Sequence, residues 1–560
     1  MEKKKVDWNT LKWIHRQTAG TRVSLTVLFI VKVLQGVEGI IFAFLLRDII
    51  DNAVAKNWDE MKLSTIFISI VVAAAILLYW ASFYFADRCK IKLGKAFRLK
   101  GFSELMTRSY ADIRKVHSGH WLTRINSDSN VIASAVTTII PSTAGLIAQF
   151  VAAVISLYIL LPKTIWFLIP LGIGMIILSL FLRTKLKNYH KTVQMREGVV
   201  VGFLQETLNS FSVIRSFTKE KDMVELGGGK MEDIVDAKMK RNRFVAACAA
   251  SIYALIRIGY VIVAVICSIQ LYGDMLSYGT LMAILRLVSQ IDGPMSEISH
   301  AIPQFFNMLA SAERMMEIES LEPDYTGSIR SVSEAREFYT HNFARIELKN
   351  AGFAYDKDDR DMVLKDFNLR IEKGDYIAFT GESGCGKSTT MNILMGLYRL
   401  SSGEALLFDD SDNKIELTSE WRSLFAYVPQ ENLLMSGTIR EAISFADPSG
   451  IKDDGRLWRS LEAACADAFV RELPQGLDTP LGEKGAGLSE GQMQRIAVAR
   501  ALFSERPILM LDESTSALDE ETEKELLAQL KKLTDRTVVI ITHRPAALNI
   551  CNKTVNFSKA

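Results

Sequence analysis

The sequence predicts two fused domains of different fold class, a membrane α-helical domain followed by an α/β domain. Two observations carry this prediction. Apolar stretches long enough to cross a bilayer as helices, about 20 residues each, occur within about the first 310 residues. Beyond about residue 340, short strand-like apolar runs alternate with helix-like runs, as in a sheet covered by helices. A length of 560 residues and a mean hydropathy of +0.14 agree with two domains, one of them in a membrane.

The first domain is predicted to contain six transmembrane helices, the last of which is interrupted by polar residues and Pro294. The predicted spans are 23–46, 63–85, 131–161, 165–182, 244–271 and 276–287 with a continuation towards residue 308. The boundaries that follow are 1–318 for this domain, 319–343 for a polar linker and 344–560 for the second domain.

The long connections 86–130 and 183–243 carry many lysines and arginines, whereas the other connections are short. Positive loops tend to remain in the cytoplasm, so we expect a multi-pass protein of the plasma or bacterial inner membrane with both termini and the second domain cytoplasmic. The net charge of +2 gives no reason to expect nucleic acid as a partner. The six cysteines are scattered without metal-ligand spacing, which predicts reduced thiols.

A phosphate-binding loop, Gly-Glu-Ser-Gly-Cys-Gly-Lys-Ser, occupies residues 381–388. The strand-like run 376–380 enters the loop and the helix-like run 389–400 leaves it. Main-chain N–H groups of such a loop cradle polyphosphate, Lys387 reaches the β- and γ-phosphate oxygens, and the Ser388 hydroxyl ligates Mg²⁺. The second domain is therefore predicted to be an α/β P-loop NTPase nucleotide-binding domain.

Further candidate residues follow the loop in chain order. Gln430 carries an amide suited to Mg²⁺ and to the attacking water, and the sequence Leu-Ser-Glu-Gly-Gln at 488–492 precedes a predicted helix whose N-terminus suits phosphate. An apolar strand at 508–511 ends in Asp512, for Mg²⁺, and Glu513, for activating the attacking water. Another apolar strand, 537–541, leads to His543, which is placed to contact the γ-phosphate.

Together these motifs resemble the ATP-binding cassette (ABC) half-transporters of the exporter type, and the resemblance covers virtually the whole chain. It implies ATP and Mg²⁺ as cofactors, Glu513 and His543 as catalytic residues, and Ser388, Gln430 and Asp512 as the Mg²⁺ site. The implied ATP-binding residues are Tyr355 (stacked on adenine), Gly381, Glu382, Ser383, Gly384, Cys385, Gly386, Lys387, Ser388, Thr389, Gln430, Ser489, Gly491 and Gln492.

The resemblance further implies a dimer in which the signature segment 488–492 of one chain completes the ATP site of the other. A second half-transporter chain is thus an expected partner, with a homodimer preferred and a heterodimer open, because Glu490 stands where the family usually has Gly. Short helices near 123–130 and 210–217 are candidates for contact with the nucleotide-binding domains.

The expected function is ATP-driven export of an amphipathic substrate such as a peptide, drug or lipid, with membrane lipids as neighbours. Ionisable residues in or near the spans favour a cargo that carries charge: Lys32, Glu38, Arg257, Arg286, Asp292, Glu297 and His300. Two alternatives remain, an importer of exporter architecture for metal chelates or vitamins, and an ATP-gated channel or regulatory subunit.

Overall fold

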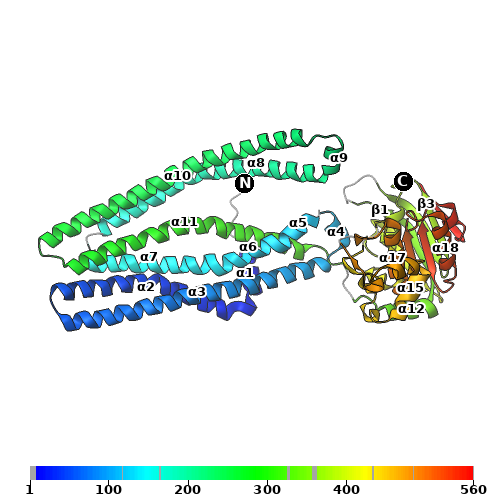
Figure 1. The fold of residues 1–560 in the computed structure, drawn as a ribbon, viewed down its shortest axis with the longest axis horizontal. Coiled ribbons are helices and arrows are strands. Elements are labelled where there is room, and N and C mark those ends of the chain that lie inside the picture. The colour runs from blue at the N-terminus through cyan, green and yellow to red at the C-terminus, as the bar shows by residue number, and fades with distance from the viewer. Residues whose placement is uncertain are drawn as a thin grey trace. The chain divides into compact units, whose positions relative to one another are not determined.

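The structure, a computed structural model, describes residues 8–116, 118–162, 165–324, 328–355, 362–431, 434–482 and 485–558. The side chains of residues 165–184, 187, 252, 292, 295–296, 298–300 and 302 lie outside this description. The chain forms two compact units (Figure 1). The membrane unit comprises Met1–Lys100 and Thr123–Met316, and the ATPase unit, named for the site described below, comprises Gly101–Leu122 and Glu317–Ala560.

The membrane unit is built from long helices that run side by side (Figure 1). Their bounds are α1 Trp8–Gln17, α2 Arg22–Val54, α3 Trp58–Met106, α6 Ser129–Ser134, α7 Ile140–Leu160, α8 Ile165–Asn209, α9 Phe211–Ser216, α10 Glu220–Tyr272 and α11 Tyr278–Ser320. Helix α2 packs along α7, and α8 packs along α10. Short π-helical turns at Arg124–Asp128 and Ala135–Ile139 lead from α5 (Ser118–Thr123) into α7.

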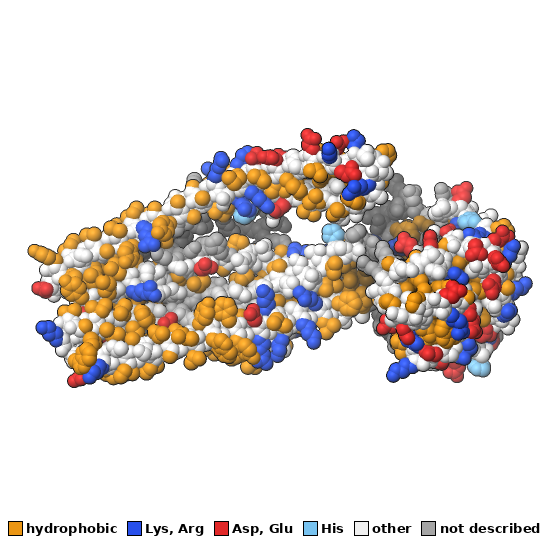
Figure 2. All heavy atoms as spheres, viewed as in Figure 1, with side chains coloured by type: hydrophobic (Ala, Val, Ile, Leu, Met, Phe, Trp, Pro, Cys, Tyr) orange, Lys and Arg blue, Asp and Glu red, His pale blue; other side chains and the backbone are white. Residues whose placement is uncertain are grey.

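Four helical segments of the described chain are long and apolar enough to span a membrane: Ala19–Val54, Trp58–Met106, Ser118–Leu160 and Glu220–Tyr272. They contain the first, second and fifth predicted spans and all but the last residue of the third. The fourth predicted span, 165–182, begins α8, but its side chains lie outside the described residues. The sixth corresponds to a shorter apolar run, Tyr278–Ile291, at the start of α11. Figure 2 shows hydrophobic side chains over the outer surface of these helices, as lipid contact requires.

Two features bring the helices of the membrane unit close together. A Cβ atom added to Gly36 of α2 would lie 2.2 Å from the carbonyl oxygen of Gly145 in α7, so the two backbones touch where small residues permit it. In α11, Pro294 provides no N–H for the carbonyl of Gln290. The Nε2 of Gln149 in α7 donates to that carbonyl at 3.0 Å, and so satisfies the acceptor that the proline leaves free.

The ATPase unit contains an antiparallel sheet of order β2-β1-β4-β5, a parallel sheet of order β11-β3-β10-β9-β6 and the small pair β7-β8. The strands are β1 Phe343–Phe353, β2 Leu364–Glu372, β3 Tyr376–Gly381, β4 Ser402–Asp409, β5 Lys414–Glu416, β6 Phe425–Val428, β7 Gly437–Thr438, β8 Pro480–Leu481, β9 Ile508–Asp512, β10 Thr537–Ile541 and β11 Lys553–Phe557. The helices are α4 Tyr110–Arg114, α12 Val332–His341, α13 Lys387–Leu394, α14 Ile439–Ser444, α15 Asp454–Ala463, α16 Asp467–Glu472, α17 Glu490–Phe503, α18 Glu520–Lys531 and α19 Pro545–Leu548.

Helix α12 lies inside the segment 319–343, which the sequence analysis assigned to a linker. Ser331 and Glu334 form a reciprocal capping box at its N-terminus, which stabilises the first turn. Its buried residues Ala335 and Tyr339 join the hydrophobic core that also holds β1 and β3. This part of the segment is therefore folded onto the ATPase unit.

Residues 101–122 of the first long connection belong to the ATPase unit, and residues 107–114 pack against the rest of it. The Tyr110 ring packs edge-on against Tyr398 with the ring centroids 5.6 Å apart, and Arg114 donates to the Tyr398 hydroxyl at 3.4 Å. The main chain of Thr107 accepts from Asp324 at 3.0 Å. The expectation that residues 123–130 and 210–217 contact the nucleotide-binding domains stays a prediction; residues 124–128 form a π-helical turn and residues 129–134 form α6.

Candidate functional site

The candidate site lies at the carboxyl edge of the parallel sheet, where ligands bind in open α/β sheets. Ile541 at the end of β10 is paired with Phe379 of β3 on one side and Asp512 of β9 on the other. Val428 at the end of β6 is paired with Leu511. The segments that follow these strand ends hold the phosphate loop, Gln430, Glu513 and His543, so the register gathers at one edge residues that are far apart in the sequence.

Three glycines give the phosphate loop its shape. Gly381, Gly384 and Gly386 have φ angles of +136°, +82° and +97°, which residues with a Cβ atom rarely adopt. At Gly381 an added Cβ would also lie 2.3 Å from the carbonyl oxygen of Phe557 in β11. The loop then enters α13, whose free N–H groups face the loop, as the strand–loop–helix prediction requires.

Lys387 bonds back to the start of the loop, and Tyr355 contacts the first turn of α13 directly after the loop. The Lys387 side chain is 7% exposed, and its ammonium donates to the carbonyls of Gly381 at 2.6 Å and Glu382 at 2.9 Å. The Tyr355 hydroxyl lies 2.8 Å from the Thr389 hydroxyl, while half of the residue is exposed. Lys387 thus places a positive charge inside the loop, and Tyr355 presents an accessible ring beside it.

Asp512 ends the buried strand β9 and is 3% exposed. Its carboxylate accepts from the Ser388 hydroxyl and, at 3.3 Å, from the Tyr427 hydroxyl. Burial raises the pKa of Asp512, because it disfavours the charged carboxylate, and the two hydroxyl hydrogen bonds lower it by a smaller amount. Ser388 and Asp512 therefore bring two oxygen ligands together, a donor set that suits a hard cation such as Mg²⁺.

Glu513 lies next to Asp512 with a φ angle of +49°, a conformation that is unusual for a residue with a side chain. Its Oε2 accepts from the Gln430 amide at 2.8 Å, and its N–H donates to the Ile541 carbonyl at 3.1 Å. His543 is exposed two residues after β10 ends. The predicted pair Gln430 and Glu513 is thus in direct contact, and His543 follows the strand between the phosphate loop and Glu513.

The signature segment is organised around the start of α17. The Ser489 hydroxyl accepts from the Gln492 N–H at 3.2 Å, and the Gln492 Oε1 accepts from the Ser489 N–H at 2.9 Å, which forms a capping box. Glu490 is the exposed first residue of α17. Among the described residues, no hydrogen bond joins this segment to the phosphate loop of the same chain.

Three residues that the sequence analysis did not name hold the site together. Tyr427 contacts Asp512, and Gln494 of α17 contacts the main chain of Glu513 at 3.1 Å. Arg544, next to His543, donates to the carbonyls of Ser516 and Leu518 at 2.6 and 3.0 Å. Neither Gln494, which stands in the polar first half of α17, nor Arg544 carried a pattern that predicts its partners.

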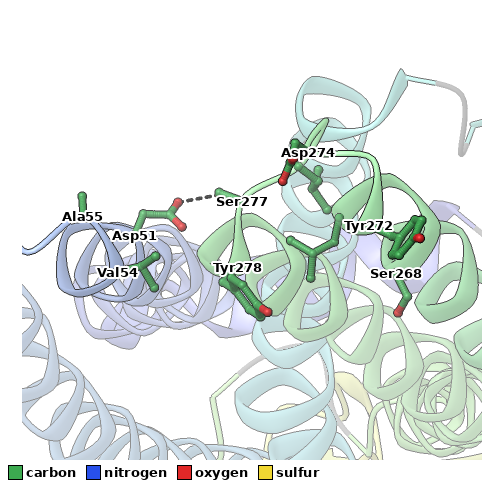
Figure 3. Close-up of a pocket in the computed structure, with 10 residues that line it drawn as sticks. Asp51, Val54, Ala55, Ser268, Tyr272, Asp274, Ser277 and Tyr278 are labelled. Carbon is green, nitrogen blue, oxygen red and sulfur yellow. Dashed lines mark hydrogen bonds between the residues drawn. The ribbon is translucent and has the colours of Figure 1, made fainter.

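The membrane unit contains a separate cavity of about 690 Å³ between the end of α2, the end of α10 and the start of α11 (Figure 3). Asp51 lies at its wall and accepts from the Ser277 hydroxyl and the Gly279 N–H, both at 2.7 Å. A carboxylate at the N-terminus of a helix is stabilised by the free N–H groups there. Asp51 therefore has a structural role, in which it joins α2 to the first turn of α11.

Comparisons with known proteins agree with this architecture. Residues 25–295 match the family model described as the ABC transporter transmembrane region, and residues 364–516 match the model described as ABC transporter. An ATP-dependent lipid A-core flippase of Pseudomonas fluorescens is 30% identical over 472 residues, which cover 82% of this chain and 75% of that protein.

Two further similarities cover most of the chain. ABC transporter B family member 1 of Dictyostelium discoideum is 30% identical over 513 residues, which cover 89% of this chain but 54% of that longer protein. The solved structure of a bacterial Atm1-family ABC exporter with ATP bound aligns with a TM-score of 0.79 at 18% identity and covers 98% of this chain and 94% of that chain, which shows a shared fold. The chain belongs to the ABC transporters, as a multi-pass membrane region followed by an ATPase domain.

Proposed function

We propose that this chain is one half of an ATP-driven exporter that moves an amphipathic substrate out of the cytoplasm. The observation that carries the proposal is the contact between Gln430 and Glu513, at the sheet edge that also holds the phosphate loop. A carboxylate held beside an amide is suited to activating a water molecule, which a nucleotide-binding module without hydrolysis does not need. A helical membrane region joined to this site supplies the second half of a pump.

In the proposed hydrolysis, Glu513 accepts a proton from the water that attacks the γ-phosphorus, and Gln430 orients that water. Lys387 and the N–H groups at the start of α13 stabilise negative charge on the phosphate oxygens, and His543 contacts the γ-phosphate. Tyr355 offers its exposed ring to adenine. When bound, Mg²⁺ would be held by Ser388, Gln430 and Asp512 and would neutralise charge on the phosphates.

The working unit is proposed to be a dimer of two such chains. The signature residues Ser489, Gly491 and Gln492 lack a hydrogen bond to their own phosphate loop within the described residues, which leaves them available for the ATP site of a second chain. ATP then joins the two ATPase domains, and hydrolysis followed by product release separates them. A homodimer is the preferred form. Glu490 brings a negative charge to the signature, so a heterodimer is the alternative that the experiment below tests.

The proposed cargo carries both an apolar body and charge. Lys32 and Glu38 lie on the same apolar helix, α2, and no ion pair joins them in the part of the chain that the structure describes. Arg286 on α11 is exposed in the single chain. Unpaired charges at membrane depth tend to face water, protein or substrate. The relative named as a lipid A-core flippase supports a lipid with charged groups as the first substrate class to test.

The test is ATP hydrolysis by the chain alone in lipid vesicles, compared with Glu513→Gln and with the surface control Glu521→Gln. We expect the first variant to lose about 100-fold or more in rate, as loss of a general base does, and the control to retain wild-type turnover. Equal turnover in the Glu513→Gln variant would contradict the proposed chemistry. A folded wild-type chain without activity would instead require a second, different chain.

Direction is measured in the same vesicles with ATP added outside, so that only outward-facing ATPase domains work. An exporter then accumulates a labelled anionic lipid or amphipathic peptide inside, or moves it to the inner leaflet. ATP-dependent release of preloaded compound would identify an importer.

A further inference from the structure

Gln494 is a buried amide on the face of α17 that packs against the catalytic edge, and it is 1% exposed. Its Nε2 donates to the Glu513 carbonyl at 3.1 Å and to the Ser516 hydroxyl at 3.4 Å. Its Oε1 accepts from the Ala517 N–H at 3.2 Å. A buried amide is costly unless it is hydrogen-bonded, and both the donor and the acceptor of this side chain find their partners in the segment 513–517.

The Glu513 backbone needs such support. Its φ angle of +49° is a strained conformation that persists only where the surroundings over-determine it. The Ile541 carbonyl holds its N–H, and the Ser516 N–H and the Gln494 Nε2 hold its carbonyl at 3.1 Å each. These bonds set the direction in which the Glu513 side chain leaves the main chain, and that side chain ends on Gln430.

The same helix carries the signature segment at its N-terminus. Ser489 caps α17 five residues before Gln494, and a Cβ atom added to Gly491 would lie 3.0 Å from the Ala517 carbonyl oxygen. The start of α17 and the segment 513–517 are therefore in van der Waals contact as well as hydrogen-bonded. The Gln494 side chain is the hydrogen-bonded part of this contact that reaches the main chain of Glu513.

We propose that Gln494 is a positioning residue that sets the orientation of the Glu513 carboxylate and links it to the signature segment. The proposal rests on the proposed function, in which Glu513 activates the attacking water and the signature meets the ATP of a second chain. When the signature segment of this chain binds the ATP held by the second chain, the orientation of the Glu513 carboxylate in this chain's own ATP site would then change. Gln494 touches no substrate, so its effect should be on turnover and its coupling, with ATP affinity unchanged.

Two substitutions of similar size separate this role from a general packing role. Gln494→Met removes both the donor and the acceptor. Gln494→Glu keeps an acceptor for the Ala517 N–H and regains a donor for the Glu513 carbonyl only when the introduced carboxyl is protonated. Leu502→Met, a volume-conserving change on the buried side of the same helix, is the matched control.

In vesicles containing the full chain, we expect Gln494→Met to lower kcat about tenfold or more, because small misplacements of a reacting group are costly. Its KM for ATP and its binding of a fluorescent ATP analogue should stay within about twofold of wild type, since the side-chain hydrogen bonds of Gln494 within the described residues go to Glu513, Ser516 and Ala517, none of which is an implied ATP-binding residue. The Hill coefficient for ATP should fall towards one. For Gln494→Glu, the rate divided by the wild-type rate should rise at least about threefold from pH 8.5 to pH 6, whereas the same ratio for Gln494→Met stays flat.

The proposal is overturned if Gln494→Met retains kcat within about twofold of wild type, or if the ratio for Gln494→Glu does not depend on pH. Should Gln494→Met fail to fold, the pH profile of Gln494→Glu decides alone. An inactive wild-type chain would contradict the homodimer in which this chain works alone, whereas an active wild type with an equally active Gln494→Met contradicts only the positioning role.

Discussion

The membrane unit and the ATPase unit obtain their geometry from different kinds of contact. In the membrane unit, polar side chains of the long helices often bond within their own helix, as Thr65 does to Met61 and Ser69 does to Thr65, both at 2.8 Å. In the ATPase unit, the site depends on strands that are distant in sequence, such as β3, β9 and β10. A local change should therefore be absorbed in the first unit and should disturb function in the second.

The largest expected effect is that of Gly381→Ala, because the new Cβ atom would meet both an unfavourable φ of +136° and the Phe557 carbonyl oxygen at 2.3 Å. We expect loss of ATP-analogue binding and of several kcal/mol, roughly 3 or more, in the stability of the ATPase unit. Gly384→Ala is the matched control, since its φ is +82° but nothing lies within 4 Å of its added Cβ. It should cost only about 1–2 kcal/mol. Equal losses in both variants would show that backbone conformation matters more than the approach of β11.

The second prediction concerns the hydrogen bond from Gln149 of α7 to the Gln290 carbonyl of α11, which Pro294 leaves without a partner in its own helix. Gln149→Leu should destabilise the unit by about 1 kcal/mol, the usual size of a hydrogen bond between membrane helices. In a Pro294→Ala background, position 294 regains an N–H for the Gln290 carbonyl, so the cost of Gln149→Leu should shrink. The remaining cost reflects the second bond, from Gln149 to the Gln290 Oε1 at 2.5 Å.

The measurement is unfolding in a detergent series for the four members of this double-mutant cycle. Gln35→Leu is the control, because Gln35 bonds to Ser82 at 3.4 Å and its bond does not depend on a proline. Its cost should be the same with and without Pro294→Ala. If Gln149→Leu costs equally in both backgrounds, the carbonyl freed by the proline is not what Gln149 stabilises.

The third prediction is a pH dependence in the ATPase unit without ligands. Burial raises the pKa of Asp512 above its unfolded value, so the folded unit binds this proton more tightly than the unfolded chain does. The stabilisation by the neutral carboxyl is present below the unfolded pKa and is lost as pH rises through the folded pKa. Asparagine does not titrate, so Asp512→Asn should not lose stability in this way as pH rises. The unfolding temperature of the variant should therefore rise relative to that of wild type between pH 4 and pH 8. Each pKa unit corresponds to about 1.4 kcal/mol.

Asp410→Asn, an exposed change in the same unit, should leave the pH profile of unfolding unchanged. With Mg²⁺ and ATP present, wild type should unfold at a higher temperature than Asp512→Asn. A cation favours the ionised carboxylate of Asp512, and a neutral asparagine side chain does not provide that charge. A constant difference between Asp512→Asn and wild type across the pH range would contradict the effect of burial on this group.

The smallest expected effect is a gain of stability in the membrane unit. Gly228 and Gly229 lie inside the long helix α10 with nothing within 4 Å of an added Cβ atom. Replacing either by Ala should stabilise the helix by up to about 1 kcal/mol, which is the difference in helix propensity. Gly227→Ala should gain less, because its Cβ would lie 3.1 Å from a ring carbon of Phe203. A loss of stability in Gly228→Ala would show that the helix is not governed by local propensity.

The sequence was most informative where the residues of one short segment are enough to determine its local structure. The phosphate loop needs glycines at positive φ and a helix after it, so residues 381–388 predicted both the local structure and the ligand. The long apolar runs predicted the helices α2, α3, α7 and α10 because a helix satisfies its main chain internally. The free state of all six cysteines also agrees with their scattered positions.

The sequence was least informative about contacts between distant segments. Tyr110 and Arg114, in the first long connection, carry no pattern in the sequence that pairs them with Tyr398. The folded helix α12 was missed because its surroundings are polar and its buried residues are few. Arg544 likewise has partners that only the fold brings near it.

By itself the sequence determined the two fold classes and the order of the motifs, and it predicted the groups that would handle phosphate, because these follow from local periodicity and side-chain chemistry. The tertiary structure decided the contact of Glu513 with Gln430, the hold of Gln494 on the Glu513 main chain, and the repair of the Pro294 break by Gln149. The physical reason is that hydrogen bonds between distant segments depend on strand register and helix packing, which are set by the whole core and are not written in any short stretch of residues.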